Sequence, residues 1–290
     1  MVAGACALFT TASDAQITSE LRARAKAGDA VAQNELGGEL LALGNSDKEA
    51  REWFRKAMLA GSPDGKNNYA SLLYHGAGGP ADPTTARRLV EEAAAAGSPA
   101  AKMTLAERYL AGADGYPRDA PRAFALRNEA ANGDSAPLAR CYAEWQVGMM
   151  WLSGQGTVKD SRQAFGWVKR SADHGCANGK LSQAVMLATG DGVAEDDVAA
   201  RNLYSDVGHS GDVNFAHGLR SLGAMTIVGE GGSVDLARGC AYVMIAMSAG
   251  DKPAKQVWAT YEDRLLGVRK ECIKISNEWS DKNLKSRSRG

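Results

Sequence analysis

Seven glycines recur along the chain at nearly constant intervals, and no long strand pattern lies between them. They are Gly28, Gly61, Gly97, Gly133, Gly175, Gly211 and Gly250, which are separated by 33, 36, 36, 42, 36 and 39 residues. A period of about 36 residues is typical of helical repeat arrays, in which each unit packs only on its neighbours. The spacing therefore predicts a helical repeat protein whose function lies on its surface.

Two further patterns repeat between these glycines. A small residue follows most of them after nine positions, and a glycine-rich turn comes next, as in Gly154-Gln155-Gly156. The second half of a unit carries alanine with a large apolar residue three places on, as in Ala50/Trp53 and Ala164/Trp167. Small residues let helices approach closely, and the spacing of three is helical. Each unit is predicted to be an antiparallel helix pair that ends at the next glycine as a C-cap.

This combined pattern resembles the Sel-1-like repeat (SLR) family, a relative of the tetratricopeptide repeats. The fourth unit carries the resemblance best, in Val147-Gly148, Gly154-Gln155-Gly156, Asp160, Ala164, Trp167 and Gly175. The resemblance covers residues 20–280 and implies an all-α fold. We expect a right-handed α/α superhelix, or solenoid, of about six helix-turn-helix repeats with a C-terminal capping helix.

The expected domain organisation is one solenoid over residues 16–280 with short flanking segments. Residues 1–15 are predicted to be a signal-peptide remnant or a disordered tail, since a small apolar run precedes small residues at Ser13 and Ala15. Residues 281–290 are predicted to be a basic disordered tail. The apolar stripe of residues 254–279 predicts the capping helix. Export would place the protein in the periplasm of a bacterial envelope or outside the cell; a cytoplasmic protein and a lipid anchor at Cys6 are alternatives.

Four cysteines remain when Cys6 is set aside, namely Cys141, Cys176, Cys240 and Cys272. An even number could form two disulfides in an oxidising compartment. Cys141 and Cys176 lie one repeat apart, and Cys240 and Cys272 lie in the last repeat and the capping segment. The alternative is that all four are small buried apolar residues.

The sequence offers little catalytic chemistry. Its 34 basic and 34 acidic residues balance, which disfavours a nucleic-acid partner. The four histidines form no H-E-x-x-H motif and no cysteine cluster, so neither a metal nor a cofactor is expected. Gly208-His209-Ser210-Gly211-Asp212 superficially resembles a nucleophile elbow, but it lies at a repeat joint with no preceding strand. The chain is predicted not to be an enzyme, and no apolar stretch is long enough to span a membrane.

Helix pairs that stack with a small rotation create a concave face that usually binds a peptide or protein. By analogy with tetratricopeptide units, fixed positions of each first helix should face this groove. The candidate partner-binding residues are Asn34, Asn67, Ser71, Tyr74, Glu107, Trp145, Met149, Asn178, His217 and Arg220. Asn34 and Asn67 occupy the same repeat position and could bond an extended peptide backbone; two solvated polar residues are the alternative. Trp145 and Met149 are either interface anchors or core residues.

The predicted function is a non-catalytic protein–protein interaction scaffold that binds a peptide or protein partner. Two other classes stay open at this point. Some SLR proteins are similar to periplasmic immunity proteins that neutralise a toxic effector such as a phospholipase. A cell-wall-acting or β-lactam-hydrolysing activity has been attributed to cysteine-rich relatives, but this sequence lacks their cysteine pattern and any nucleophile constellation.

Overall fold

The computed structural model describes residues 18–44, 46–133 and 137–283. Within these residues it contains fifteen α-helices, one short 3₁₀-helix and no strand, so the predicted all-α fold is confirmed. The predicted leader of residues 1–15 lies outside the described residues. The last helix continues to Asn283, so the tail predicted for residues 281–290 begins inside a helix and then leaves the described part of the chain.

The chain divides into two compact units, with the division between residues 135 and 136. We call them unit 1, described over residues 18–133, and unit 2, described over residues 137–283, and consider each by itself. The solenoid predicted to be continuous over residues 16–280 remains a prediction.

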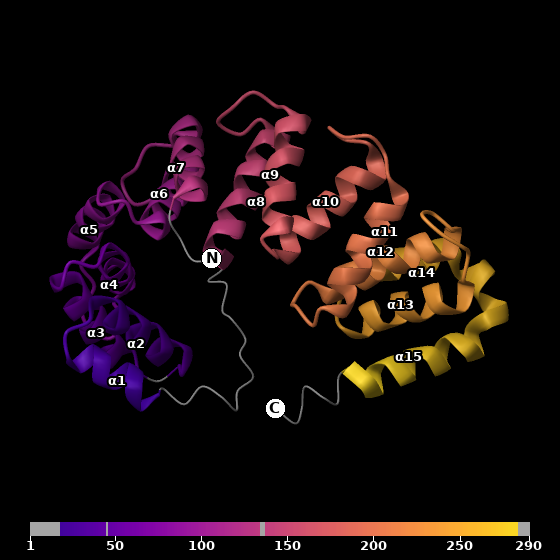
Figure 1. Ribbon diagram of the computed structural model, residues 1–290, viewed down its shortest axis with the longest axis horizontal. Helices are drawn as coiled ribbons and strands as arrows, with labels where there is room; N and C mark the ends of the chain where they lie inside the picture. Colours follow the sequence, from indigo (N-terminus) through magenta and orange to yellow (C-terminus); the bar gives the residue numbers. More distant parts are fainter. Residues whose placement is uncertain (1–17, 45, 134–136, 284–290) are drawn as a thin grey trace. The chain divides into compact units, whose positions relative to one another are not determined.

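Unit 1 is a run of short helices joined by tight turns (Figure 1). A single helix precedes three pairs, in which each helix packs on the next one along the chain. The elements are α1 (Ser19–Lys26), α2 (Ala30–Ala42), α3 (Asp47–Leu59), α4 (Pro63–His75), α5 (Pro83–Ala95), α6 (Pro99–Ala111) and α7 (Ala120–Asn132). The pairs are α2/α3, α4/α5 and α6/α7.

Unit 2 contains three more pairs and a cap. Its elements are α8 (Pro137–Ser153), α9 (Ser161–Asp173), α10 (Ala177–Thr189), α11 (Asp197–His209), α12 (Phe215–Val228), α13 (Leu236–Ser248), α14 (Ala254–Leu265), the 3₁₀-helix η1 (Leu266–Val268) and α15 (Arg269–Asn283). The six pairs from α2/α3 to α12/α13 match the predicted number of repeats. Helix α8 has 17 residues where most of the others have 13, so the long interval from Gly133 to Gly175 reflects a longer first helix in the fourth unit.

The predicted capping helix is broken into two. The chain turns at η1, around Gly267, so that both α14 and α15 pack against α13. The predicted apolar stripe from Trp258 to Trp279 is buried or half-buried against the core of unit 2. The stripe therefore does cap the last pair, but a straight helix could not have kept both of its halves on α13.

The recurring glycines end helices through a shared backbone motif. At the end of α3, the Ser62 N–H donates to the Ala57 carbonyl at 2.9 Å and the Gly61 N–H donates to the Met58 carbonyl at 3.0 Å. This is the Schellman pattern, and it requires positive φ one residue beyond the C-cap, where Gly61 has φ 89°. The glycine was predicted to be the C-cap itself, but in the structure the C-cap is Ala60 and Gly61 is the next residue. Gly133 differs, because it is itself the C-cap of α7 and has φ −77°.

The glycine-rich turns inside the repeats bring neighbouring repeats into backbone contact. A Cβ atom added to Gly192, which follows α10, would overlap the carbonyl group of Ser161 at the start of α9. Gly78 and Gly231 stand in the same relation to Asp47 and Asp197 at the starts of α3 and α11. Each of these turns thus rests on the second helix of the preceding pair, which leaves no room for a side chain.

The core repeats a close contact between the two helices of a pair. An added Cβ on Gly37 of α2 would come within 2.6 Å of the Phe54 ring in α3, and one on Gly148 of α8 would come within 2.7 Å of Val168 in α9. The alanine of the second-helix pattern, introduced above at Ala50 and Ala164, occurs in five second helices and is fully buried in each; these alanines are Ala50, Ala86, Ala123, Ala164 and Ala200. The predicted role of small residues at helix crossings is confirmed.

Three arginines form hydrogen bonds between one repeat and the glycine-rich turn of the next repeat. The sequence pattern did not predict these bonds. Each arginine follows the buried alanine of a second helix and donates to backbone carbonyls in the glycine-rich turn of the next repeat. The bonds run from Arg51 to Ala77 (3.1 Å) and Pro80 (2.8 Å), from Arg87 to Gly115 (3.2 Å), and from Arg201 to Glu230 (3.2 Å). In α9 the equivalent position is Phe165, which packs into the apolar core instead.

Candidate partner-binding site

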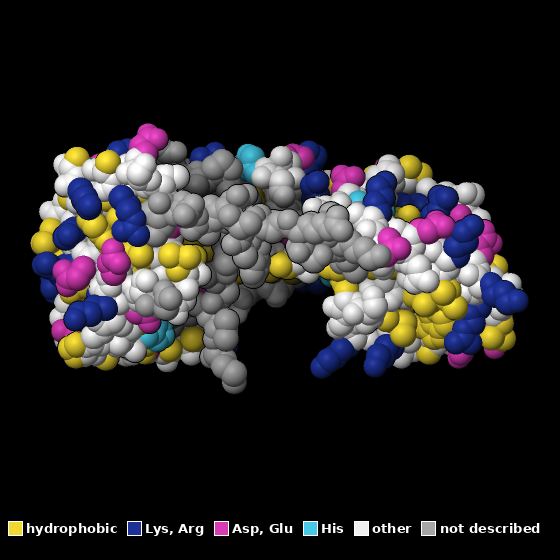
Figure 2. Space-filling model, turned by 90° about the horizontal axis from the view of Figure 1, so that it is seen from below, with side chains coloured by type: hydrophobic (Ala, Val, Ile, Leu, Met, Phe, Trp, Pro, Cys, Tyr) yellow, Lys and Arg dark blue, Asp and Glu magenta, His cyan; other side chains and the backbone are white. Residues whose placement is uncertain are grey.

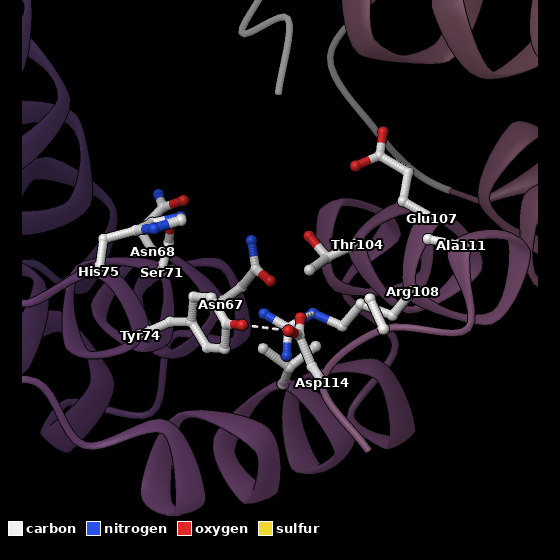
Figure 3. A pocket seen from close by; sticks show the side chains of 12 residues that line it. Asn67, Asn68, Ser71, Tyr74, His75, Thr104, Glu107, Arg108, Ala111 and Asp114 are labelled. Atoms are coloured by element: carbon white, nitrogen blue, oxygen red, sulfur yellow. Dashed lines mark hydrogen bonds and ion pairs between the residues drawn. The ribbon is translucent and has the colours of Figure 1, made fainter. Parts of the chain in front are cut away.

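A cavity of about 310 Å³ opens in unit 1 between α4, α6 and the turn that follows α6 (Figure 3). We call it the Asn67 pocket. It is lined by Asn67, Asn68, Ser71, Tyr74, His75, Val90, Thr104, Glu107, Arg108, Ala111, Ala113 and Asp114. Its volume lies near the lower end of the range of about 300–1,000 Å³ that is typical of small-ligand sites.

Helix periodicity places these side chains together. The lining residues of α4 from Asn67 to His75 have spacings of one, three and four, and those of α6 from Thr104 to Ala111 have spacings of one and three, so each set shares one face of its helix. Both helices begin in the same way, with a serine N-cap followed by proline. The Ser62 hydroxyl accepts from the Gly65 N–H at 3.0 Å, and the Ser98 hydroxyl accepts from the Ala101 N–H at 3.0 Å.

Three side chains form the fixed part of the pocket. The Tyr74 hydroxyl donates to the Asp114 carboxylate, and Arg108 Nε lies 3.5 Å from the other carboxylate oxygen. The Arg108 guanidinium also lies over the Tyr74 ring, 5.0 Å from its centroid. The hydrogen bond to Asp114, together with burial, raises the pKa of Tyr74 above its ordinary value of 10.0, so the hydroxyl stays a donor.

Two polar atoms in the pocket have no hydrogen-bond partner among the described residues. They are Asn67 Oδ1, an acceptor, and Arg108 Nη1, a donor. Asn67 is only 7% exposed, and the Arg108 side chain is 10% exposed. A buried polar atom without a partner costs about 1–3 kcal/mol, so such atoms are rare in folded proteins and need an explanation.

The Asn67 pocket gathers four of the five candidate residues of unit 1: Asn67, Ser71, Tyr74 and Glu107. Asn34 lies outside it, and its Oδ1 accepts from Asn68 Nδ2 at 2.8 Å. The polar lining residues that sequence reasoning missed are Asn68, His75, Thr104, Arg108 and Asp114. Asn68, Thr104 and Ser182 share one repeat position, two residues before the small residue of the first helix, so their common polarity was a usable signal.

The first three candidate residues of unit 2 make contacts between successive first helices. Trp145 Nε1 in α8 donates to Ser182 Oγ in α10 at 3.0 Å, and that hydroxyl lies 3.9 Å from Met149 Sδ. Asn178 Oδ1 in α10 accepts from Asn214 Nδ2, just before α12, at 3.0 Å. The pair Asn178/Asn214 thus repeats in unit 2 the link that Asn34 and Asn68 make in unit 1.

The other two candidate residues of unit 2 lie near its cap. Arg220 Nη1 pairs with both carboxylate oxygens of Asp251, at 3.0 and 3.2 Å, and Asp251 also accepts from the Ala254 N–H at the start of α14. Burial, followed by the positive charge of Arg220, lowers the pKa of His217 below its ordinary value of 6.5. Arg220 therefore already has a structural partner that ties α12 to the cap.

The structure has both cysteine pairs as disulfides. Cys141 in α8 is bonded to Cys176 just before α10, and Cys240 in α13 is bonded to Cys272 in α15; the Cα–Cα distances are 5.7 and 5.6 Å. Three of these four cysteines are fully buried; the exception is Cys176. Each bond joins elements that are neighbours in the fold but more than 30 residues apart in sequence.

Charge gives no sign of a broad electrostatic partner surface. On the face drawn in Figure 2, the basic and acidic side chains of each unit are interspersed. The described residues contain no group of three His, Cys, Asp or Glu side chains placed to hold a metal ion. Among the same residues, no helix combines the length and the apolar character needed to cross a bilayer.

Comparison with protein families identifies the class of this solenoid. The Sel1 repeat model matches residues 30–62, 63–98, 99–135, 141–176 and 178–205. These ranges make up more than half of the chain, which therefore belongs to the Sel1 repeat family. The first three ranges each contain one helix pair, from α2/α3 to α6/α7. The fourth range contains most of α8 and all of α9, the fifth contains most of α10 and of α11, and the pair α12/α13 lies beyond the matched residues.

Solved structures with the same fold include two from bacteria. A protective antigen present in uropathogenic Escherichia coli strains, which displays an SLR fold, is 25% identical with a TM-score of 0.69 over 92% of this chain. The chain spans 56% of the length of that protein. A Sel1 repeat protein from Oxalobacter formigenes is 22% identical, with a TM-score of 0.61 over 90% of this chain and 79% of that one, and shows the fold alone. No curated protein matches the sequence.

Membership of the Sel1 repeat family indicates the general function of the chain. Sel1 repeat proteins are generally non-catalytic scaffolds for protein–protein interaction. The Asn67 pocket suits an interaction surface, because it offers hydrogen-bonding atoms and an aromatic ring on a repeat surface.

Proposed function

We propose that this protein is a non-catalytic scaffold that binds a peptide or protein segment on the first helices of its repeats. The observation that carries this proposal is the pair of unpartnered atoms in the Asn67 pocket, Asn67 Oδ1 and Arg108 Nη1. A bound segment would supply the missing partners and recover the free energy that their burial costs. In unit 2, half-buried first-helix side chains such as Trp145 and Met149 would supply further contact area.

We further propose that the protein works in an oxidising compartment of the bacterial envelope. The two disulfides support this, because disulfides persist in the periplasm and outside the cell but are rare in the cytosol. Alkylation of the native protein without reduction, followed by mass spectrometry, should leave Cys141, Cys176, Cys240 and Cys272 unmodified. Modification of all four in freshly prepared cells would contradict an oxidising location.

Site-specific crosslinking in the native organism tests the scaffold proposal. A photoreactive amino acid is placed at Ser71, an exposed residue that lines the Asn67 pocket, and in a second strain at Arg88 on α5, whose side chain is 64% exposed. Both sites are solvent-accessible and lie in the same unit, so nonspecific collisions should label them equally. We expect a discrete crosslinked band in the strain with the photoreactive residue at Ser71 and no such band in the strain with it at Arg88.

The crosslink must also depend on the pocket. In the Ser71 crosslinking strain, the added substitution Glu107→Ala removes an exposed lining side chain without touching the core and should weaken the band. Equal bands from Ser71 and Arg88, or no band from Ser71 at any expression level, would refute binding at this surface.

A further inference from the structure

The geometry points to a neutral amide as the group that the Asn67 pocket recognises, an inference that rests on the proposed function and specifies its ligand. Asn67 Oδ1 needs a donor and Arg108 Nη1 needs an acceptor. An amide carries both, an N–H and a C=O, within one small planar group. Figure 3 shows the Asn67 amide and the Arg108 guanidinium directed into the same cavity.

The charges around the pocket argue against a carboxylate. Arg108, which would otherwise attract an anion, is already paired with Asp114. Glu107 lines the same cavity, so one positive side chain faces two negative ones, Glu107 and Asp114. A carboxylate that entered would lose hydration and meet like charges, which raises its free energy.

Glu107 and Asp114 would attract a cationic group, but such a group cannot provide partners for both Asn67 Oδ1 and Arg108 Nη1. An ammonium near Asn67 Oδ1 would share the cavity with the Arg108 guanidinium, whose side chain is 90% buried and poorly screened by solvent. It would also have nothing to offer Arg108 Nη1, because an ammonium is a donor without an acceptor. Only a neutral group with both functions completes the two atoms without adding charge.

The remaining lining fixes the pocket before a ligand arrives. Tyr74 is held by its bond to Asp114, and Arg108 is held by the same carboxylate and by the Tyr74 ring. Side chains that are already ordered lose little conformational entropy on binding. Val90, Ala111 and Ala113 supply an apolar part of the wall, which suits the carbon atoms next to an amide.

Two sources of an amide are distinguishable by small probes. N-methylacetamide mimics the secondary amide of a main chain, and propionamide mimics the primary amide of an Asn or Gln side chain. Propionate is nearly isosteric with propionamide but carries the charge that the pocket should reject, and propylammonium carries the opposite charge. Each probe is titrated into the isotope-labelled full-length protein, and the backbone amide signals of Asn67, Ser71 and Arg108 are followed by NMR.

The inference expects saturable shifts with at least one of the two amides. Propionate and propylammonium should bind at least about tenfold more weakly than that amide, which corresponds to one lost hydrogen bond or one unfavourable charge. Preference for N-methylacetamide would identify a main-chain ligand, and preference for propionamide an Asn or Gln side chain. Propionate or propylammonium binding as tightly as the better amide, or no saturable shift with any probe, would overturn the inference.

A substitution at Asn67 separates a binding role from a structural one. Asn67→Leu removes the unpartnered oxygen at similar volume, so it should abolish the amide-induced shifts while leaving the melting temperature unchanged or higher. The control, Asn202→Leu, changes an exposed asparagine of α11 in unit 2 and should keep amide binding. Amide binding that survives in Asn67→Leu, or a large fall in its melting temperature, would contradict the assigned role.

The outcome of the crosslinking experiment is independent of these titrations. A Ser71-specific partner in cells together with no amide preference would refute the amide inference and leave the scaffold proposal standing. Amide binding without any Ser71 crosslink would refute the scaffold proposal as a cellular function of this surface.

Discussion

At the scale of residues, the most informative side chains of this protein are those that the fold leaves incompletely bonded. Asn67 and Arg108 are buried by their neighbours, yet each keeps one polar atom without a partner among the described residues. Asn34 and Asn178 are less buried and are fully explained by their bonds to Asn68 and Asn214. The contrast suggests that the same residue type links repeats at one position and serves a ligand at another.

The pKa of His217 leads to a prediction about pH. Because the fold lowers this pKa below 6.5, the folded chain favours the neutral imidazole and the unfolded chain takes up a proton first. The corresponding stability is present above pH 6.5 and is lost as the pH falls through the folded-state pKa. Arg220 disfavours the charged ring and Asp251 favours it, so both charges are part of the effect.

The measurement compares urea unfolding of the wild type and His217→Gln between pH 7.5 and pH 5. Glutamine does not titrate, so the variant should lose less stability than the wild type across that interval. A parallel loss in both proteins would show that His217 does not contribute to the pH dependence.

Sequence reasoning located four residues of the pocket because helix periodicity fixes which side chains of α4 and α6 share a face. It did not locate Asp114, because that residue lies in a turn and has φ 60°, a conformation that no helical pattern encodes. Arg108 was missed for a related reason. Its neighbour Glu107 met the spacing rule, whereas the partners of Arg108 are fixed only once the turn is folded.

At the scale of elements, some glycines are required by the backbone contacts between repeats, and others could be replaced without a steric clash. Gly192 has φ 77° and lies directly on the backbone of Ser161, which is the contact between one turn and the preceding repeat. Gly166 lies inside α9 on an exposed surface, and an added Cβ there meets nothing within 4 Å. The two glycines lie in the same unit and have opposite roles.

We therefore predict opposite effects of the same substitution. Gly192→Ala should lower the free energy of unfolding by about 1–3 kcal/mol, because the methyl group collides with backbone and alanine disfavours positive φ. Gly166→Ala should raise it by about 0.5–1 kcal/mol through helix propensity. Chemical denaturation of both variants checks the pair, and a stabilising Gly192→Ala would show that the turn is not held as the structure has it.

The arginine contacts mark a limit of sequence reasoning at this scale. Arg51, Arg87 and Arg201 recur in register, but a basic residue on an exposed helical position usually belongs to a solvated surface. Their carbonyl acceptors are backbone atoms, which leave no residue pattern in the sequence. The role of the alanine before each arginine was predictable, because it depends on the small size of the side chain, and a small residue at a repeated position is visible in the sequence.

At the scale of the whole molecule, the two units differ in how they are held together. All four described cysteines lie in unit 2, where Cys141–Cys176 joins the first two helix pairs and Cys240–Cys272 joins the last pair to the cap. The described part of unit 1 has no disulfide and is held by packing, caps, hydrogen bonds and ion pairs. Sequence gives the cysteine positions, and the division between residues 135 and 136 falls at the start of the longest glycine interval, the 42 residues from Gly133 to Gly175.

Reduction should therefore act on one unit. Each bond closes a loop of more than 30 residues, for which chain entropy suggests a contribution of roughly 4 kcal/mol. In hydrogen-exchange mass spectrometry with a phosphine reductant, peptides from α8 to α15 should exchange faster and peptides from α2 to α6 should not change. Equal acceleration in both units would mean that they unfold as one.

The glycine turn that ends each second helix also affects how a gene for such a protein can change in length. Because the same backbone motif closes helices at Gly61, Gly97 and Gly175, a chain spliced from one of these points to another meets the junction that it already had. Unequal crossing-over between two such codons would add or delete complete modules without inventing a new connection. Such an exchange would lengthen or shorten the binding surface by whole repeats.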